Sequence, residues 1–269
     1  MRRVLVVTSI TVALGASCQL INGLDSLRFV DGGVDARPDE AAPDANVRDA
    51  RPGFDCSFDG HAGPTPMVPV AIDAGVSFCI EQTEVTFQQF WEFSQEAGLP
   101  EAAPCNVGRN SLLSSDTCET PAHAPVTNVP WCGAYWYCEG LHRELCQDDV
   151  PWIHACRGPA DTDYPYGDKF DDSRCNVNGE EAGTVPWNGG SCAGGVPGLY
   201  DMVGNVAEWV FSCTDPNRST CYAVGGGYEA GMAGCYTAPT LPNSYAVPST
   251  TRDPQIGFRC CAVVEGTCP

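Results

Sequence analysis

The cysteines constrain this chain more than any other feature of its sequence. There are 17 of them, and all but Cys18 lie in an even set that runs from Cys56 to Cys268. Such a density in an exported chain is typical of a disulfide framework. No Cys-x-x-Cys pair occurs, and the four histidines do not stand at zinc-ligand spacing with cysteines. A structural zinc site is therefore the weaker interpretation.

The first 17 residues have the layout of a secretory signal. Two arginines precede an apolar segment over residues 4–15, which is too short to span a bilayer and is followed by small residues. The segment closes on Gly-Ala-Ser-Cys18, which resembles a bacterial lipobox except for the glycine. We expect residues 1–17 to be a signal peptide and Cys18 to be lipidated. The alternative is an ordinary signal that is cut near Ala16 or Ser17.

Residues 18–55 lack the side chains for a core. Asp, Ala, Pro, Arg and Gly dominate residues 32–52, so this segment cannot offset the entropy of ordering. We predict a disordered, acidic and proline-rich linker, which is either a spacer between a membrane and the domain or a tail without a role. The expected location is the cell envelope, with a lipid anchor as the one membrane contact; secretion is the alternative.

The charge of the chain excludes one class of partner. The formal net charge is -20, and Lys169 is the only lysine, so no basic stripe is available to neutralise phosphates. Nucleic acid is therefore not an expected partner.

Residues 56–269 are expected to form the folded domain, with sparse regular structure between Gly- and Pro-rich loops. After the strand-like residues 78–86, helical spacing begins behind Thr86, a plausible N-cap, and ends near Gly98. A second helix is predicted over residues 129–141, with Tyr135 on its buried stripe.

Seven short motifs occur in an order that resembles the formylglycine-generating enzyme, or sulfatase-modifying factor, family over residues 66–263. They are EVTFQQFWEF, PVTNVPWCGAYWYCEGL, ACRGPADTDYPYGD, CNVNG, GLYDMVGNVAEWV, VGGGYE and IGFRCC. The resemblance implies an α+β fold related to C-type lectin domains, with little regular structure. The superfamily includes copper-dependent oxidases that convert a sulfatase cysteine to formylglycine, iron-dependent sulfur-transfer enzymes, and members of unknown activity.

The resemblance also implies a calcium site in the stretch GLYDMVGNVAEWV. The family pattern maps side-chain ligands onto Asp201 and Glu208, and backbone carbonyl ligands onto Gly204 and Val206. A cation there would relieve the repulsion between two acids in an apolar turn, since calcium prefers carboxylate and carbonyl oxygens. The alternative is that Asp201 is an ordinary turn residue and that Glu208 is a surface acid of a helix or strand.

A second, weaker calcium site would use Asn176 and the carbonyl of Val177, with Glu180 and Glu181 as candidate acidic partners. Its acidic ligand is not clear from the family pattern.

Two disulfides follow from the resemblance in the same way. It implies one bridge between Cys138 and Cys260 and another that joins Cys156 to a partner near Cys235. Because a bridge between adjacent cysteines needs a strained ring, we expect Cys260 and Cys261 to have different partners.

The catalytic positions depart from the family pattern. The copper oxidases need two thiolates, but Ala230 stands where the first catalytic cysteine belongs, with Val224 and Gly227 in place of an arginine and a serine. Only Cys235 matches the second position, and its use there conflicts with a bridge to Cys156. We therefore expect no copper site.

Three functions are consistent with these observations. One is oxidation of a protein Cys or Ser, the second is a noncatalytic, calcium-stabilised module that recognises a protein or carbohydrate, and the third is a structural subunit of a surface assembly. We favour the second. Four loop aromatics are candidates for lining a sugar or peptide groove: Tyr164, Tyr166, Trp187 and Tyr245. For Tyr166 and Trp187, packing under the loops is the simpler interpretation.

Overall fold

The fold is described here from a computed structural model. It describes residues 56, 64–72, 77–96, 122–147, 151–179, 192–229, 233–235 and 245–263, all within one compact unit over residues 45–269. The predicted signal peptide, Cys18 and the linker all lie outside the described residues, which begin at Cys56. Within the described part of the chain, no helix has the length and apolar character needed to cross a membrane.

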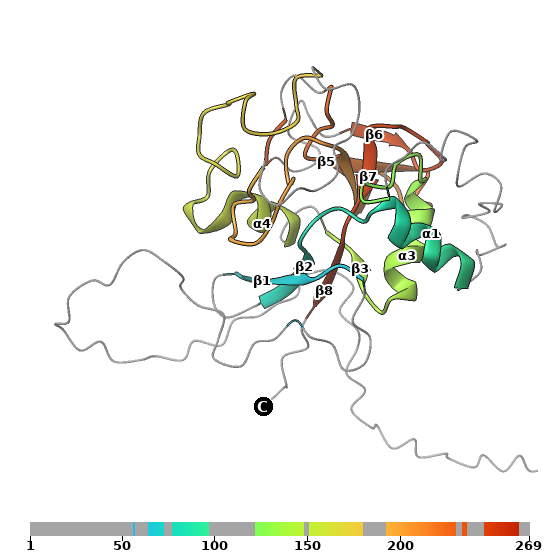
Figure 1. The fold of residues 1–269 in the computed structure, drawn as a ribbon. Helices are drawn as coiled ribbons and strands as arrows, with labels where there is room; N and C mark the ends of the chain where they lie inside the picture. Colours follow the sequence, from blue (N-terminus) through green and yellow to red (C-terminus); the bar gives the residue numbers. More distant parts are fainter. Residues whose placement is uncertain are drawn as a thin grey trace, which may run out of the picture. The chain divides into compact units, whose positions relative to one another are not determined.

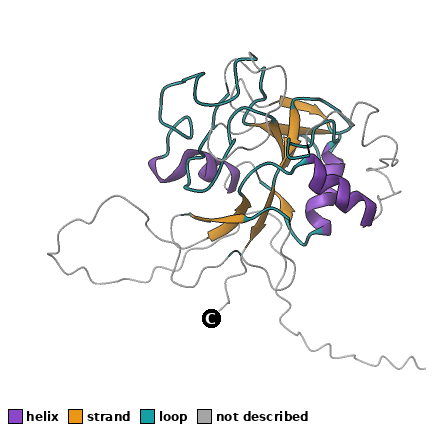
Figure 2. Cartoon of the chain, viewed as in Figure 1, coloured by secondary structure: helices purple, strands orange, loops and turns teal. Residues whose placement is uncertain are grey.

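Regular elements are short and are separated by long turns (Figures 1 and 2). The helices are α1 (Phe87–Glu96), α3 (Trp131–Gly140), α4 (Ile153–Arg157) and the 3-10 helix η5 (Gly158–Ala160). The strands are β1 (Met67–Ala71), β2 (Ser77–Glu81), β3 (Glu144–Leu145), β4 (Ala207–Cys213), β5 (Thr220–Val224), β6 (Tyr245–Pro248), β7 (Ile256–Phe258) and β8 (Cys260–Val263). The predicted α+β class with little regular structure is confirmed.

The strands form two four-stranded sheets. The first has the order β1-β2-β8-β3, and the second has the order β6-β5-β4-β7. All pairings are antiparallel except β4 with β7, in which Glu208 lies opposite Gly257. Strands β7 and β8 are separated by a single residue, Arg259, yet belong to different sheets. Arg259 is therefore the point at which the chain passes from one sheet to the other.

Helix α1 begins where its sequence predicts. The Thr86 hydroxyl accepts the Gln89 amide at 3.3 Å, and the Gln89 side chain accepts the Thr86 amide at 2.8 Å. This reciprocal pair is a capping box, which satisfies two amides that the first helical turn leaves without partners. The predicted N-cap is therefore confirmed.

Helix α3 occupies the predicted segment and buries most of the predicted stripe. Trp131, Ala134 and Cys138 are buried, and Tyr135 packs against the same core cluster with part of its surface exposed. The stripe missed Tyr137, which lies between α1 and β7 in contact with Phe90 and Phe258.

Two clusters of buried side chains form the core. One surrounds α4 and the strands of the first sheet and includes Phe78, Trp152 and Met202. The other lies between α1, α3 and the second sheet and includes Phe90, Trp209 and Phe258. Aromatic rings are the largest members of both clusters, so a chain with small sheets still removes much apolar surface from water.

Every cysteine of the described residues is in a disulfide. Six bridges join described cysteines to one another: Cys56–Cys79, Cys138–Cys260, Cys146–Cys261, Cys156–Cys235, Cys175–Cys192 and Cys213–Cys221. These include both pairs that the family resemblance implied. The adjacent Cys260 and Cys261 take different partners, as expected. Bridges on this scale indicate an exported protein.

Removing a bridge should lower stability according to the loop that it closes. Cys138 and Cys260 are 122 residues apart, whereas Cys213 and Cys221 are 8 apart. In the chain-entropy model, the free energy of unfolding falls by about 5 kcal/mol for C138A/C260A and by about 2.5 kcal/mol for C213A/C221A. Urea denaturation of the two double variants measures this difference. Equal losses would contradict the entropic explanation.

Candidate functional site

The centre of the candidate site is a buried ion pair between Arg259 and Glu208. The Arg259 Nε lies 2.8 and 2.9 Å from the two carboxylate oxygens of Glu208, and its Nη2 lies 2.7 Å from Oε1. Both side chains are almost completely excluded from solvent. Such a forked contact is the strong form of the arginine–carboxylate pair because two donors fix its geometry.

The remaining donors of Arg259 bind backbone carbonyls of two other segments. Its Nη1 donates to the carbonyls of Glu81 and Gln82 at 3.0 and 3.3 Å, where β2 ends. Its Nη2 donates to the carbonyls of Tyr200 and Asp201 at 2.9 and 3.3 Å. One guanidinium thus joins the first sheet, strand β4 of the second sheet and the turn that carries the predicted calcium ligands.

Glu208 has a second buried donor. The indole Nε1 of Trp152 lies 2.7 Å from Glu208 Oε2. Both oxygens of this predicted calcium ligand are therefore hydrogen-bonded to protein groups, and the positive charge beside them is a guanidinium. No pattern in the sequence around Glu208 predicts these two partners.

The turn between Tyr200 and β4 has an unusual backbone. Asp201, Gly204 and Asn205 all have positive φ values, of 55°, 80° and 60°. Only glycine adopts this region freely, and Asp and Asn are the residues that tolerate it best. A Cβ atom on Gly204 would lie 2.5 Å from the Val177 side chain, so glycine is also required for close packing. The sequence of this turn is therefore fitted to its shape.

The two predicted calcium segments lie against each other at this turn. The Asn205 amide donates to the Asn176 carbonyl at 2.8 Å, and the side chains of these residues are 3.4 Å apart. Asn205 also donates from its side chain to Glu84 at 3.1 Å. Glu180 and Glu181, the candidate acidic partners of the weaker site, lie outside the described residues.

Acidic side chains outnumber the guanidinium at this centre. Glu84, Asp201 and Glu208 are all buried near Arg259. Burial, with the charges of Asp201 and Glu208 adding to it, raises the pKa of Glu84 well above its ordinary value. Burial also raises the pKa of Asp201 to about 6, although Arg259 opposes the shift. Protonation of one of these acids, or binding of a cation beside them, is therefore favoured at this centre.

Calcium remains a prediction for this centre. Among the residues that the structure describes, no three or more His, Cys, Asp or Glu side chains are grouped as metal ligands. Asp201 and the carbonyls of Gly204 and Val206 belong to one turn, as expected, but Glu208 is bound to Arg259 and Trp152. The excess of buried acids fits a cation, whereas the hydrogen bonds of Glu208 leave it less free to be a ligand.

A second buried ion pair lies beside the first. Arg143 contacts the carboxylate of Glu81, whose other oxygen accepts the Cys260 amide at 2.8 Å. Burial raises the pKa of Glu81 to about 7, although Arg143 opposes the shift. Because the amide of the residue after Arg259 is bound here, the two ion pairs hold the same short segment of chain.

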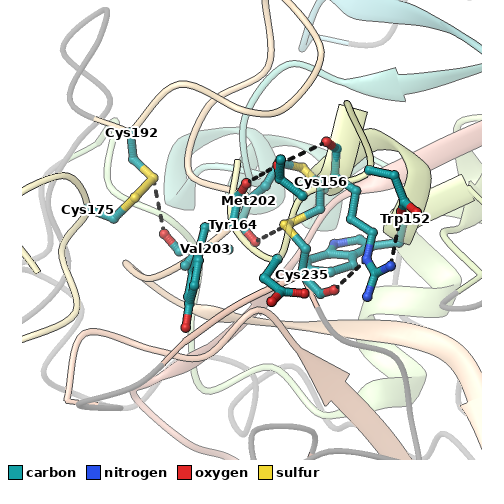
Figure 3. Close-up of a disulfide and its surroundings, with 12 residues drawn as sticks. Trp152, Cys156, Tyr164, Cys175, Cys192, Met202, Val203 and Cys235 are labelled. Carbon is teal, nitrogen blue, oxygen red and sulfur yellow. Dashed lines mark hydrogen bonds and ion pairs between the residues drawn. A yellow bond between two sulfur atoms is a disulfide. The ribbon is translucent and has the colours of Figure 1, made fainter. Parts of the chain in front are cut away.

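The cysteine that matches a catalytic position is not a free thiol. Cys235 is completely buried and bonded to Cys156 in α4, with an S–S distance of 2.00 Å (Figure 3). Arg157 donates to the Cys235 carbonyl at 3.1 Å, and the Cys235 amide donates to the Asp163 carbonyl at 2.9 Å. Cys235 is a doubtful catalytic candidate because that role conflicts with a bridge to Cys156, and the structure contains that bridge. Ala230 lies outside the described residues.

Three positions in the motifs that precede Cys235 are packed. Gly227 has no room for a side chain, since a Cβ atom there would lie 2.9 Å from Gln255. Tyr164 is 6% exposed and stacks on Tyr166 at 5.5 Å between ring centroids. Tyr166 packs against the core cluster around α4, as the simpler interpretation of that ring predicts. Trp187 and the side chain of Tyr245 lie outside the described residues.

Comparison with known families agrees with this geometry. Residues 50–264 match the model of the sulfatase-modifying factor enzyme 1-like domain. The chain belongs to this family. The resemblance found in seven short motifs is thus confirmed over most of the chain.

Curated relatives of the sulfatase-modifying factor family differ in what their names state. The chain is 35% identical over 100 residues to the inactive C-alpha-formylglycine-generating enzyme 2 of Bos taurus, covering 33% of each chain. It is 29% identical over 151 residues to the Mus musculus protein of the same name, covering 51% of this chain and 48% of that one. It is also 30% identical over 161 residues to the serine/threonine-protein kinase pkn1 of Chlamydia pneumoniae, covering 57% of this chain.

The match spans only a quarter of the length of that kinase, 25%, and half or less of the two formylglycine-generating relatives. The kinase name therefore describes a much longer protein and is not carried over to this chain.

Solved structures support the fold of the sulfatase-modifying factor family. The CarF crystal structure aligns with a TM-score of 0.52 and 19% identity, covering 75% of this chain and 97% of that one. Treponema denticola variable protein 1 aligns with a TM-score of 0.50 and 16% identity, covering 74% and 93%. At these identities the likeness shows the fold alone.

Substituting Arg259 should be far more damaging than substituting an exposed arginine. R259M leaves the Glu208 carboxylate buried without its charge partner, so the free energy of unfolding should fall by about 3–5 kcal/mol. The matched control is R174M, because Arg174 pairs with Asp171 on the surface at 3.6 Å and should change stability little. Chemical denaturation of both variants measures the difference. Similar losses in both would show that Arg259 does not hold the fold together.

Proposed function

We propose that this chain is a noncatalytic member of the sulfatase-modifying factor family, which acts as a recognition or scaffold module on the outside of a cell membrane. The observation that carries this proposal is the buried bridge between Cys156 and Cys235. It supports the loss of the oxidase reaction, because a sulfur atom in a disulfide is not a thiolate that can hold copper or exchange with a substrate thiol.

The other catalytic position supports the same proposal. Ala230 has no sulfur, and an alanine side chain cannot bind a soft metal ion. Two relatives that are named inactive C-alpha-formylglycine-generating enzyme 2 are consistent with a family in which the fold persists without the reaction. The alternative is an active oxidase of a protein cysteine or serine. It would require a copper ligand from another part of the protein, since Ala230 cannot supply one.

The proposed location follows from the sequence and the bridges together. Disulfides indicate export, while Cys18 and the acidic linker over residues 18–55 would hold the domain at a distance from a membrane surface. A rigid, bridged domain on such a tether is suited to binding a protein or carbohydrate ligand. The acidic charge of the chain argues against nucleic acid as that ligand.

Calcium is the proposed structural cofactor. Asp201 and the carbonyls of Gly204 and Val206 would hold it, with Glu208 shared between the ion and Arg259. When bound, calcium would neutralise buried acids that Arg259 alone does not balance. We propose no catalytic role for it.

The state of Cys235 provides the sharpest test of the proposed function. After alkylation of the denatured but unreduced protein, the peptide that contains Cys235 should carry no label, whereas C156A should carry label at Cys235. The wild-type protein, loaded with copper and given a cysteine-containing sulfatase peptide, should form no aldehyde, as measured by mass spectrometry. Labelled wild-type Cys235 together with aldehyde product would favour the active oxidase instead.

Removing calcium should destabilise the protein if the ion is bound at the predicted turn. At a calcium concentration about one hundred times the dissociation constant, binding contributes about 2.7 kcal/mol, which a chelator removes. Thermal unfolding with calcium and with chelator measures the shift. D201N should unfold at the same temperature in both conditions, because it lacks a charged ligand. A chelator effect of equal size in D201N would place the ion elsewhere, and no effect in the wild type would remove calcium from the proposal.

A further inference from the structure

Three aromatic rings surround one guanidinium at the β4–β5 hairpin. The Cζ of Arg218 lies 5.2 Å from the ring centroid of Trp131, 5.3 Å from that of Tyr135 and 4.9 Å from that of Phe211. The three centroids are 5.3 to 5.9 Å from one another. All three distances to the cation fall within the range of cation–π attraction. We call these three rings the aromatic cage.

The cage is built by elements other than the loop that carries Arg218. Trp131 and Tyr135 stand one turn apart on α3 and stack with an angle of 8° between their planes, while Phe211 projects from β4. The indole Nε1 of Trp131 donates to the Val210 carbonyl at 2.8 Å, which fixes this ring against β4. Trp131 is therefore held against β4 without Arg218, whereas the Tyr135 side chain also has a hydrogen bond with Arg218.

Arg218 reaches the cage from a loop that is shaped separately. The Asp215 carboxylate accepts the amides of Asn217 and Ser219 at 2.9 and 3.1 Å, and the Ser219 hydroxyl at 2.6 Å. Arg218 has a φ of 55°, in the left-handed region, and a disulfide between Cys213 and Cys221 closes the base of the hairpin. Residues 214, 216, 217 and 219 of this loop are exposed and Arg218 is partly exposed, so solvent reaches the loop that carries the guanidinium.

An open cavity of about 440 Å³ adjoins the cage. Trp131, Phe211 and Pro216 line it, together with Asp215 and Arg218. Its volume lies in the range of sites that bind side chains or small ligands. Trp131 is 1% exposed whereas Phe211 is 38% exposed, so one ring is buried beneath the cavity and the other lies at its opening.

The charges around the cavity favour a cationic occupant. Hydrogen bonds from Ser219 lower the pKa of Asp215, which keeps this carboxylate charged at neutral pH. The faces of aromatic rings attract cations, and a chain of net charge -20 draws positively charged partners toward itself. Arg218 is the cation that meets this field, since it lines the same cavity.

We propose that the aromatic cage is a recognition site for an arginine side chain of a partner protein, and that Arg218 occupies the site until the partner displaces it. The contacts of Arg218 show that a planar guanidinium fits over all three rings. Arg218 thus acts as an internal competitor that weakens the binding of any other guanidinium to the three rings. This inference rests on the proposed recognition function and names the chemistry of its ligand.

Removing the internal competitor should strengthen binding of a guanidinium. The probes are the peptide acetyl-Gly-Arg-Gly-amide and its citrulline counterpart, which has nearly the same shape but no charge. By calorimetric titration, R218A should bind the arginine peptide about tenfold more tightly than the wild type does, with no comparable gain for the citrulline peptide. R218Q, which keeps a polar side chain without the charge, should show the same gain and serves if R218A is unstable.

The matched control removes one wall of the cage. R218A/F211A should lose the gain, because Phe211 is an exposed ring whose removal leaves the core intact. No gain in R218A and R218Q, an equal gain for the citrulline peptide, or a gain that survives F211A would each overturn the proposal. These results are independent of the Cys235 test, so a failed cage and an active oxidase are distinguishable outcomes.

Discussion

The buried guanidinium of Arg259 is the interaction on which the rest of the structure depends. A charge in an apolar interior is costly unless its donors are all directed at acceptors, and here they reach a carboxylate and the carbonyls of two further segments. The cost of burying both charges means that the pair is not simply a source of stability. Its geometry instead requires one relative placement of β2, β4 and the turn at Asp201, because any other placement would leave a buried ion without partners.

The disulfides reinforce the same short segment of chain. Cys260 and Cys261 follow Arg259 directly and bind Cys138 in α3 and Cys146 after β3. The Cys260 amide is also held by Glu81. Residues 259–261 thus connect α3, both sheets and the buried side chain of Glu81. Since regular elements are short, this concentration of specific contacts replaces the long strands and helices that stabilise larger sheet proteins.

Local features of the fold could be predicted from the sequence, whereas its charge network could not. Thr86 and the apolar spacing after it predict α1 because capping and periodicity act within one turn of helix. The family motifs implied the Cys138–Cys260 and Cys156–Cys235 pairs. The partners of Glu208, by contrast, are 51 and 56 residues away in Arg259 and Trp152, and no local pattern encodes that distance. The arginine in IGFRCC, between two apolar strands, was the available signal for a buried cation.

The parallel pairing of β4 with β7, followed at once by the entry of β8 into the other sheet, has a consequence for biogenesis. Both sheets need residues 256–263, which stand close to the end of the matched domain at residue 264. The first sheet needs β8 between β2 and β3, and the second needs β7 beside β4. Neither sheet can therefore be completed while the ribosome or a translocation channel still holds this segment. The native bridges of Cys260 and Cys261 lie in this same final stretch, so they can close only after both sheets have received their last strands.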